Sequence, residues 1–247
     1  MWLSKLFKKE APTKGGLEWL QTDMHSHLIP GIDDGSPNVE ASIQLIRGLM
    51  DLGYKKVITT PHILWDMYPN TPEKINGGLE LVRQRLKEEG IDFEIHAAAE
   101  YFIDEHFVNH LVAKQPLLTL KANLVLVEIS TVTAPLDFRE VLFELQMQDY
   151  KPVIAHPERY IYLKNNRDIF EDLKLSGCLL QLNLLSLVGH YGVAIQQLAE
   201  FLIKQGFYDF AGTDLHHVNH LPLIAKAASS PLLATLREQG VLKNARL

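Results

Sequence analysis

The stretch Leu124-Val125-Leu126-Val127-Glu128 joins a short run of β-forming apolar residues to a carboxylate at its end. Similar apolar runs recur along the chain, and longer segments with helical periodicity lie between them. The predicted strands cover residues 20–24, 56–60, 93–98, 124–129, 152–155, 179–184 and 208–212. Seven successive strand–helix units predict an α/β fold with a parallel sheet, either closed into a barrel or doubly wound.

Helix start signals support this alternation. Ser36-Pro37 and Thr71-Pro72 each place a capping residue before a proline, which suits the first position of a helix. The second of these helices is predicted to run to about residue 89. Further helices are predicted over residues 103–113, 137–149, 168–176, 193–205 and 223–239.

Imidazoles or carboxylates follow six of the seven predicted strands. These residues are His25, His27, Asp34, His62, Glu100, Glu128, His156, Asp214 and His216. In a barrel the C-terminal ends of many strands meet around one mouth, whereas a doubly wound sheet gathers its functional groups near one switch point. The spread of these residues over many strand ends therefore favours the barrel.

The mixture of side chains at these ends is typical of a metal site. His25 and His27 are two residues apart, so an extended chain points both toward the same side. Imidazole and carboxylate ligands together suit zinc, manganese and iron. Nine potential ligands exceed what one ion can use, and they fit two or three ions.

Several of these residues also have a purely structural interpretation. Asp33-Asp34-Gly35 has the composition of a simple turn. Glu128 could be a charge at the sheet edge, but a carboxylate at the end of an apolar strand is costly unless it is paired or bound to metal. A lone histidine is more often a hydrogen-bonded structural group than a ligand. The histidines expected to have that role are His96, His106, His110 and His190.

The composition of the 247 residues, 47% hydrophobic and 22% charged, is that of a globular protein, with a single domain expected over residues 17–247. Residues 1–16 are expected to form a flexible basic tail, for which a weak contact with a membrane surface stays open. No apolar run approaches the ~20 residues of a transmembrane helix, and the opening does not have the pattern of a secretory signal. We therefore expect a cytoplasmic protein without a transmembrane segment.

Cysteine content and net charge exclude two other classes. Cys178 is the only cysteine, so an internal disulfide is excluded, and no arginine follows it closely, as a cysteine-dependent phosphatase would need. The formal net charge of −6 argues against nucleic acid as a partner, because binding of a phosphate backbone needs a basic surface. Bound divalent cations would change the charge locally, so an anionic substrate stays compatible with this figure.

The motifs around the strand-end residues resemble the PHP (polymerase and histidinol phosphatase) superfamily. Its opening pattern is matched by Asp23-Met24-His25-Ser26-His27 and Gly31-Ile32-Asp33-Asp34-Gly35. The match continues through Thr60-Pro61-His62, Ala99-Glu100, Val127-Glu128-Ile129-Ser130, Ala155-His156-Pro157-Glu158-Arg159-Tyr160 and Gly212-Thr213-Asp214-Leu215-His216. The short gap between the opening histidines and the Asp-Asp-Gly turn is similar to one branch, the CpsB/YwqE-like bacterial protein-tyrosine phosphatases.

This resemblance implies a distorted (β/α)7 TIM-like barrel with the nine strand-end residues as metal ligands. The centre would favour manganese and hold two or three ions, with zinc, iron(II) or magnesium as alternatives. The implied activity is hydrolysis of phosphotyrosine on a protein substrate, a bacterial tyrosine kinase that controls capsule or exopolysaccharide synthesis. Arg159 matches an arginine that the family uses to bind phosphate. Some members carry a second arginine after the last motif, where this chain has His217 and His220.

The expected mechanism is direct attack on phosphorus by a metal-bound hydroxide, without a cysteine intermediate. Arg159 would bind the phosphoryl oxygens as charge builds up on them. His217 or His220 would act as the general acid if the leaving phenolate needs one.

Aromatic residues after the strands are candidate walls of a slot for the phenyl ring. They are Trp65, Tyr68, Tyr101 and Tyr160. Three other functions stay open: a phosphoesterase acting on a small ester such as histidinol phosphate, a nuclease, and a non-catalytic scaffold. The acidic net charge disfavours the nuclease, and the complete ligand set disfavours the scaffold.

Overall fold

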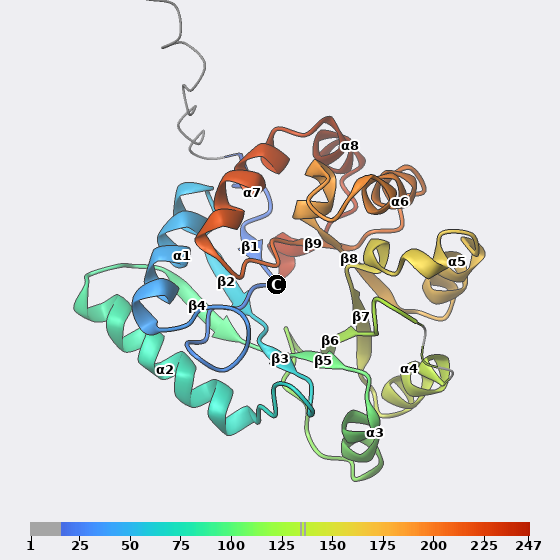
Figure 1. Ribbon diagram of the computed structural model, residues 1–247, viewed down its shortest axis with the longest axis horizontal. Helices are drawn as coiled ribbons and strands as arrows, with labels where there is room; N and C mark the ends of the chain where they lie inside the picture. Colours follow the sequence, from blue (N-terminus) through green and yellow to red (C-terminus); the bar gives the residue numbers. More distant parts are fainter. Residues whose placement is uncertain (1–15, 134, 136) are drawn as a thin grey trace, which may run out of the picture.

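The computed structural model describes residues 16–133, 135 and 137–247. In this part of the chain, strands gather at the centre and helices surround them (Figure 1). The expected flexible tail and its membrane contact fall on residues 1–15, outside the described residues.

The named strands are short, and neighbouring strands all pair in parallel. They are β1 (Thr22–Asp23), β2 (Lys56–Thr59), β3 (His62–Ile63), β4 (Glu94–Ala97), β5 (Glu100–Phe102), β6 (Leu124–Glu128), β7 (Lys151–Ala155), β8 (Leu179–Asn183) and β9 (Phe210–Gly212). One sheet has the order β1-β2-β4, and the other has the order β3-β5-β6-β7-β8-β9.

Nine strands stand in the described residues where the sequence predicts seven, because a second short strand follows the predicted end of two of them. β2 resumes as β3 after Pro61, whose ring nitrogen lacks the N–H that a continuous ladder needs. The neighbouring strand is divided into β4 and β5 at the same level. The N–H of Ala98 donates to Thr59 O at 2.8 Å and that of Glu100 to Pro61 O at 3.1 Å. The two chains therefore stay side by side across the interruption.

Hydrogen bonds also join the first strand to the last. The N–H of His27 donates to Leu215 O at 3.0 Å, and the N–H of Asp214 donates to His25 O at 2.8 Å. Ser26 and Leu215 form a parallel bridge between the same two segments. The segment after β1 therefore lies beside the segment after β9, and the sheet curls around a common centre (Figure 1).

Two apolar clusters fill the two sides of this curled sheet. Successive side chains of a strand point to opposite faces. In β6, Leu126 joins an inner cluster, whereas Val125 and Val127 join an outer one that also contains apolar residues of the helices. The inner cluster consists of Met24, Ile58, Ala98, Leu120, Leu126, Val153, Ala155, Leu179, Phe210 and Leu247. The continuous apolar run of β6 thus contributes side chains to two separate cores.

The helices follow the predicted order, with two corrections. They are α1 (Val39–Asp51), α2 (Pro72–Glu88), α3 (Glu105–Val112), α4 (Phe138–Met147), α5 (Asp168–Leu175), α6 (Val193–Lys204), α7 (Leu221–Ala228) and α8 (Pro231–Gln239). The predicted cap of α2 is confirmed, since the Thr71 side chain accepts a hydrogen bond from Lys74 N at 3.3 Å.

The predicted cap of α1 is wrong. Asn38, and not Ser36, accepts the hydrogen bond from Ala41 N, at 2.9 Å. The Ser36 hydroxyl is held instead by Asn38 O and the Ser42 hydroxyl, each at 2.9 Å.

The single helix predicted over residues 223–239 is also wrong. It is divided into α7 and α8 at Pro231, which starts a new helix behind the capping residue Ser230. In the described residues, every helix is too short or too polar to span a membrane. The architecture is an α/β fold with a curled parallel sheet.

Candidate metal centre

The nine strand-end residues predicted as ligands all come together at the C-terminal ends of the strands. They form four overlapping groups, in each of which the ligand atoms lie within 4.8 Å of one another. The groups are His27, Asp34, His62 and His216; His25, His27 and Glu100; His25, His156 and Asp214; and His62, Glu100 and Glu128. Four of the nine residues belong to two groups each, so the groups form one continuous centre.

Two glycines let the chain pass close to the first two histidines. A Cβ atom on Gly35 would lie 2.3 Å from the Cβ and the carbonyl oxygen of His27. A Cβ atom on Gly212 would lie 2.6 Å from the Cβ of His25. Neither distance is compatible with a side chain, so the motifs Asp-Asp-Gly and Gly-Thr-Asp need glycine for packing against these histidines.

Hydrogen bonds fix the orientation of the His25 and His27 rings. Gln181 Nε2 donates to Leu182 O at 2.6 Å, so its Oε1 accepts from His25 Nδ1–H at 2.9 Å. Asp33 Oδ2 accepts from His27 Nδ1–H at 2.8 Å. In the neutral form of each ring Nε2 therefore carries the lone pair, and the two Nε2 atoms lie 3.4 Å apart. Two lone pairs at this distance repel each other unless a cation or a proton lies between them.

The surrounding carboxylates attract positive charge to the same place. Burial alone lowers the pKa of His25, but the carboxylates of Glu100 and Asp214 outweigh this effect and raise the pKa to about 9. Burial also opposes protonation of His27, and the carboxylates of Asp33, Asp214 and Glu100 raise its pKa well above the ordinary value. A metal cation can supply this positive charge in place of protons.

Glu100 lies in the middle of the centre and is fully buried. Its Oε2 lies 3.1 Å from His25 Nε2 and 3.2 Å from His62 Nδ1, and its Oε1 lies 3.1 Å from His156 Nε2. Burial alone raises the pKa of Glu100, but the charges of His25 and His62 lower it well below the ordinary value. Since its two oxygens face different imidazoles, this carboxylate has the geometry of a bridge between two ligand groups.

Glu128 adds a second buried carboxylate beside Glu100. Its Oε1 lies 3.6 Å from His156 Nε2, and its Oε2 lies 3.9 Å from His62 Nδ1. Burial and repulsion from Glu100 raise the pKa of Glu128 well above the ordinary value. Burial, together with the nearby Arg159 guanidinium, lowers the pKa of His156 to about 4. The alternative interpretation of Glu128 as a charge at the sheet edge is therefore not supported, because its carboxylate lies within the cluster.

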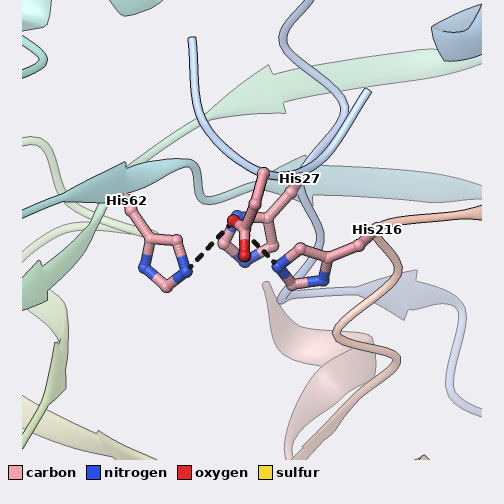
Figure 2. A group of neighbouring side chains, drawn as sticks. His27, His62 and His216 are labelled. Atoms are coloured by element: carbon pink, nitrogen blue, oxygen red, sulfur yellow. Dashed lines mark ion pairs between the residues drawn. The ribbon is translucent and has the colours of Figure 1, made fainter. Parts of the chain in front are cut away.

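The outer group surrounds Asp34, which is the most exposed of the nine residues. Asp34 Oδ1 lies 3.6 Å from His62 Nε2 and 3.5 Å from His216 Nε2. Figure 2 shows the rings of His27, His62 and His216 close together, and its dashed lines mark ion pairs within this group. His216 Nδ1–H donates to Asp214 O at 2.9 Å, so the lone pair of its Nε2 faces Asp34. The Asp-Asp-Gly segment is thus more than a turn, because Asp33 orients His27 and Asp34 faces the imidazoles.

Asp214 is oriented by three donors on one of its oxygens. Its Oδ2 accepts from Asn183 Nδ2 at 2.7 Å, from Arg159 Nη1 at 3.2 Å and from the Tyr191 hydroxyl at 3.4 Å. Its Oδ1 is thereby left facing His25 Nε2, at 3.3 Å. The Arg159 guanidinium also lies over the Tyr191 ring, 4.6 Å from its centroid.

The sequence interpretation missed these supporting residues, which include Gln181, Asn183 and Tyr191. A signal existed for the first two, because they are polar residues at alternate positions of a strand that is otherwise apolar. Such a pair points to the same face as the ligands. Tyr191 gave no signal, since a tyrosine in a connecting segment is common.

A cavity of about 270 Å³ opens onto the metal groups. Its walls include Arg159, Tyr191, His217 and His220, so the residues predicted to contact substrate do line it. His190 lines it as well, with its ring 5.3 Å from that of His220, although it lies outside the four ligand groups. Burial and the neighbouring His216 lower the pKa of His220 to about 4, which makes this ring a neutral hydrogen-bond donor at neutral pH.

The remaining predictions for aromatic and histidine residues have different outcomes. Tyr101 and Tyr160 are buried in the outer core and do not line the cavity over the metal groups, so the prediction that they wall the slot for the phenyl ring is wrong. Tyr68 stacks on His62, with ring centroids 5.6 Å apart. Trp65 stacks on His106 outside the metal centre. His96, His106 and His110 lie outside the four ligand groups, which agrees with the role expected for them.

Two of the clustered residues adopt left-handed backbone conformations. His156 follows β7 with φ of 31°, and Asp214 follows β9 with φ of 51°. Non-glycine residues rarely adopt positive φ, and the cost is of order 1 kcal/mol for each. The surrounding hydrogen bonds, among them the bond from Asp214 N to His25 O, hold these conformations.

The residues present fit a multinuclear metal centre. Imidazole nitrogens and carboxylate oxygens converge here, and the Arg159 guanidinium lies at one side of the cavity. Imidazole and carboxylate donors without thiolate suit manganese, iron and zinc. Such an arrangement can bind and polarise an anionic ester above the metal groups.

Comparison with known proteins places these observations in a family context. The family model for capsular polysaccharide synthesis proteins, CpsB/CapC, matches residues 21–232. The chain is 28% identical over 196 residues to the tyrosine-protein phosphatase YwqE of Bacillus subtilis, covering 79% of this chain and 77% of that protein. It is 24% identical over 211 residues to the tyrosine-protein phosphatase CpsB of Streptococcus agalactiae, covering 83% and 87%.

A solved structure shows the same similarity in three dimensions. It comes from work on YwqE of Bacillus subtilis and CpsB of Streptococcus pneumoniae, described as metal-dependent tyrosine phosphatases. The TM-score is 0.77 at 26% sequence identity, covering 90% of this chain and 94% of that one.

Proposed function

Because the chain belongs to the CpsB/CapC family of capsular polysaccharide synthesis proteins, we propose that it is a metal-dependent protein-tyrosine phosphatase. The observation that carries this proposal is the centre of nine imidazoles and carboxylates beneath a cavity that also holds Arg159. Relatives that match over most of their length are named tyrosine-protein phosphatases. In a phosphate monoester with an aryl leaving group, the phosphate would match Arg159 and the bound metal ions, and the aryl group would match the ring-lined cavity.

The nine strand-end residues are the proposed ligands, and manganese is the proposed metal, bound as two or three ions. Zinc, iron(II) and magnesium are the alternatives that the experiment below distinguishes. When bound, such ions lower the pKa of a coordinated water from 15.7 to about 7 and neutralise phosphate charge. Asp33 and Gln181 hold the ligating histidines in the required tautomer.

Arg159 is proposed to bind the phosphoryl oxygens. Its guanidinium is held by Asp214 and Tyr191 at the wall of the cavity, and its pKa is raised further, so it stays charged. A planar guanidinium binds two phosphate oxygens at once, and this stabilises charge that develops during transfer. His217 and His220 also line this cavity, and we propose that they contact the same substrate as hydrogen-bond donors.

Cys178 takes no part in this chemistry. The side chain is buried beside Ser176, and burial raises the pKa of its thiol. A buried thiol outside the cavity cannot serve as the nucleophile.

We further propose a phosphotyrosine on a bacterial tyrosine kinase of capsule or exopolysaccharide synthesis as the physiological substrate, reached in the cytoplasm. The family description supports the link to capsular polysaccharide, and the names of relatives support the tyrosine specificity. The net charge of −6 gives no support to a nucleic-acid substrate.

The finer description of the fold is a distorted (β/α)7 barrel formed by residues 17–247. Counting β2 with β3 and β4 with β5 gives seven strand units, since each pair is one strand with an interruption. The hydrogen bonds between the segments after β1 and β9, together with the inner apolar cluster, support closure into a ring.

The test is hydrolysis of a phosphotyrosine peptide by protein stripped of metal and then resupplied with manganese, zinc, iron(II) or magnesium. We expect activity to return with manganese first. The same preparations are assayed on histidinol phosphate, phosphoserine peptide and a single-stranded oligonucleotide. Hydrolysis of histidinol phosphate in preference to the phosphotyrosine peptide would overturn the proposed substrate and leave the metal centre standing. Absence of hydrolysis with every metal and substrate would overturn the enzyme assignment.

A further inference from the structure

A second cavity, of about 360 Å³, lies beside the metal centre. It shares no lining residue with the cavity of about 270 Å³ that opens onto the metal groups. It is bounded by the segment after β3, the start of α2 and the start of α3. Its apolar and aromatic walls include Ile63, Trp65, Pro72, Tyr101, His106 and Phe107. The volume lies at the lower end of the range of about 300–1,000 Å³ that is usual for ligand pockets. This cavity is called the Trp65 groove below.

The Trp65 groove begins one residue beyond the metal centre. His62 pairs with Glu100 across β3 and β5, and the next pair along the same strands is Ile63 with Tyr101. Successive side chains point to opposite faces of a strand. The first pair therefore belongs to the metal centre, whereas the second pair lines the groove.

Hydrogen bonds tie the wall of the groove to the metal centre. Asn70, which lines the groove, donates from Nδ2 to His62 O at 2.8 Å and to Ile32 O at 2.9 Å. Asp104 Oδ2 accepts from Trp65 N at 3.1 Å. The groove is thus a fixed extension of the rim that carries His62.

Trp65 is the exposed anchor of the groove. Its ring stacks on His106 with centroids 3.8 Å apart and planes at 10°, yet 43% of the residue remains exposed. A rigid aromatic ring that is held on one side and open to solvent beside a cavity is typical of a binding hot spot. Packing of the loop alone would be served equally by a smaller apolar residue.

We propose that the Trp65 groove binds an apolar or aromatic side chain that flanks the phosphotyrosine in an extended peptide substrate. This inference rests on the proposed phosphatase function. An extended chain advances about 3.3–3.6 Å per residue, so the three positions on either side of the phosphotyrosine cover about 10 Å of chain in each direction. A small phosphate ester would occupy only the cavity of about 270 Å³ at the metal groups. The groove therefore gives the enzyme a preference among phosphotyrosine proteins.

The test uses the full chain loaded with manganese and a set of phosphotyrosine peptides. In this set phenylalanine replaces alanine at each of the three positions before and after the phosphotyrosine, one at a time. Phenyl phosphate serves as the substrate without a peptide. We expect one position to raise kcat/KM by about tenfold, mainly through KM, because an anchored hot-spot side chain contributes on this scale.

Variants assign the preference to the groove. Trp65→Ala should remove the phenylalanine preference, and Trp65→Phe should restore most of it. The matched control is Met67→Ala on the same loop, since this side chain is 65% exposed and does not line the groove. Met67→Ala should keep both the preference and the activity of the unaltered protein. A loss on phenyl phosphate as large as the loss on peptides would show a disturbed metal centre and overturn the assignment.

The outcomes separate the two proposals. Equal kcat/KM for all peptides, with clear hydrolysis of each, would overturn the groove and leave the phosphatase function intact. A phenylalanine preference that survives Trp65→Ala would also overturn it. Failure to hydrolyse any phosphotyrosine peptide would overturn the proposed function and the groove with it.

Discussion

The two ends of the curled sheet bury the same kinds of charged side chain and satisfy them in opposite ways. At the N-terminal end, Asp209 accepts hydrogen bonds from Lys243 Nζ at 2.7 Å, from Leu180 N at 3.0 Å and from Lys174 Nζ. At the C-terminal end, Glu100 and Glu128 face imidazole nitrogens, and the cation nearest to this cluster is Arg159 at its edge.

This difference indicates that the N-terminal end of the sheet serves stability and that the C-terminal end serves function. A buried carboxylate with lysines and a backbone N–H has all the positive partners that it needs within the chain. A cluster of carboxylates and imidazole lone pairs needs a cation from outside, and it remains strained without one. Metal removal should therefore affect one end only, and four predictions test this.

The largest effect is expected from His25→Ala combined with His27→Ala. This double variant removes two ligands that between them belong to three of the four ligand groups. Hydrolysis of a phosphotyrosine peptide should therefore fall by ~10³-fold or more. In the unaltered protein, metal at about 100 times its Kd should raise the free energy of unfolding by about 2.7 kcal/mol. The variant should lose this increment. Thermal unfolding with and without manganese measures it, and an undiminished increment would contradict the assignment of these ligands.

A smaller loss of activity is expected from Arg159→Ala. The guanidinium contacts the phosphate and not the metal in our proposal, so kcat/KM should fall by about 10²-fold while the metal content stays unchanged. Arg159→Lys should recover only part of the activity, because an ammonium group cannot bind two oxygens in the fork geometry. Steady-state kinetics with metal analysis of each variant tests this. Equal losses of metal and activity would instead make Arg159 a structural support of Asp214.

The opposite end should respond in stability alone. Asp209→Asn leaves Lys174 and Lys243 without their carboxylate and should lower the free energy of unfolding by about 2 kcal/mol, equally with and without metal. Turnover per folded molecule should stay within about twofold of the unaltered protein. The matched change Asp34→Asn at the exposed rim should weaken metal binding with little change in apo stability. A metal-dependent stability loss in Asp209→Asn would break the proposed division between the two ends.

The smallest effect is expected at Cys178. Burial raises the pKa of this thiol, so the reactive thiolate is scarce at neutral pH and alkylation should be slow. Treatment with iodoacetamide, and the variant Cys178→Ala, should each change kcat/KM by less than about twofold, because the side chain lies outside the cavity. Rapid inactivation that tracks alkylation of Cys178 would return the thiol to the mechanism.

Local signals explain how far the sequence alone predicts this molecule. Strand ends with imidazoles or carboxylates identify the site because parallel strands bring their C-terminal ends together whatever the helices do. All nine predicted residues accordingly lie in one cluster. The division of the strand at Pro61 was also readable, since proline cannot donate to a ladder, yet the apolar run on either side concealed it.

Other features depend on contacts between distant segments and could not be predicted in the same way. Tyr101, Tyr160 and Tyr191 all follow predicted strands, but only packing decides that the first two are buried in the outer core and that the third lines the cavity over the metal groups. His190 and its neighbour Tyr191 lie away from the predicted ligands in sequence and reach the cavity through the connection before α6. A single sequence carries no information about such distances.

The left-handed backbone at His156 and Asp214 has a consequence for the engineering of this enzyme. Glycine or asparagine at either position would relax the backbone, and each change would contribute stability on the order of 1 kcal/mol. Random libraries of the metal-free protein screened only for heat resistance should therefore enrich substitutions at these two positions and discard the ligands along with the strain. Directed evolution of a more robust variant needs selection for turnover in every round, because at this centre the most stable chain and the working enzyme are different sequences.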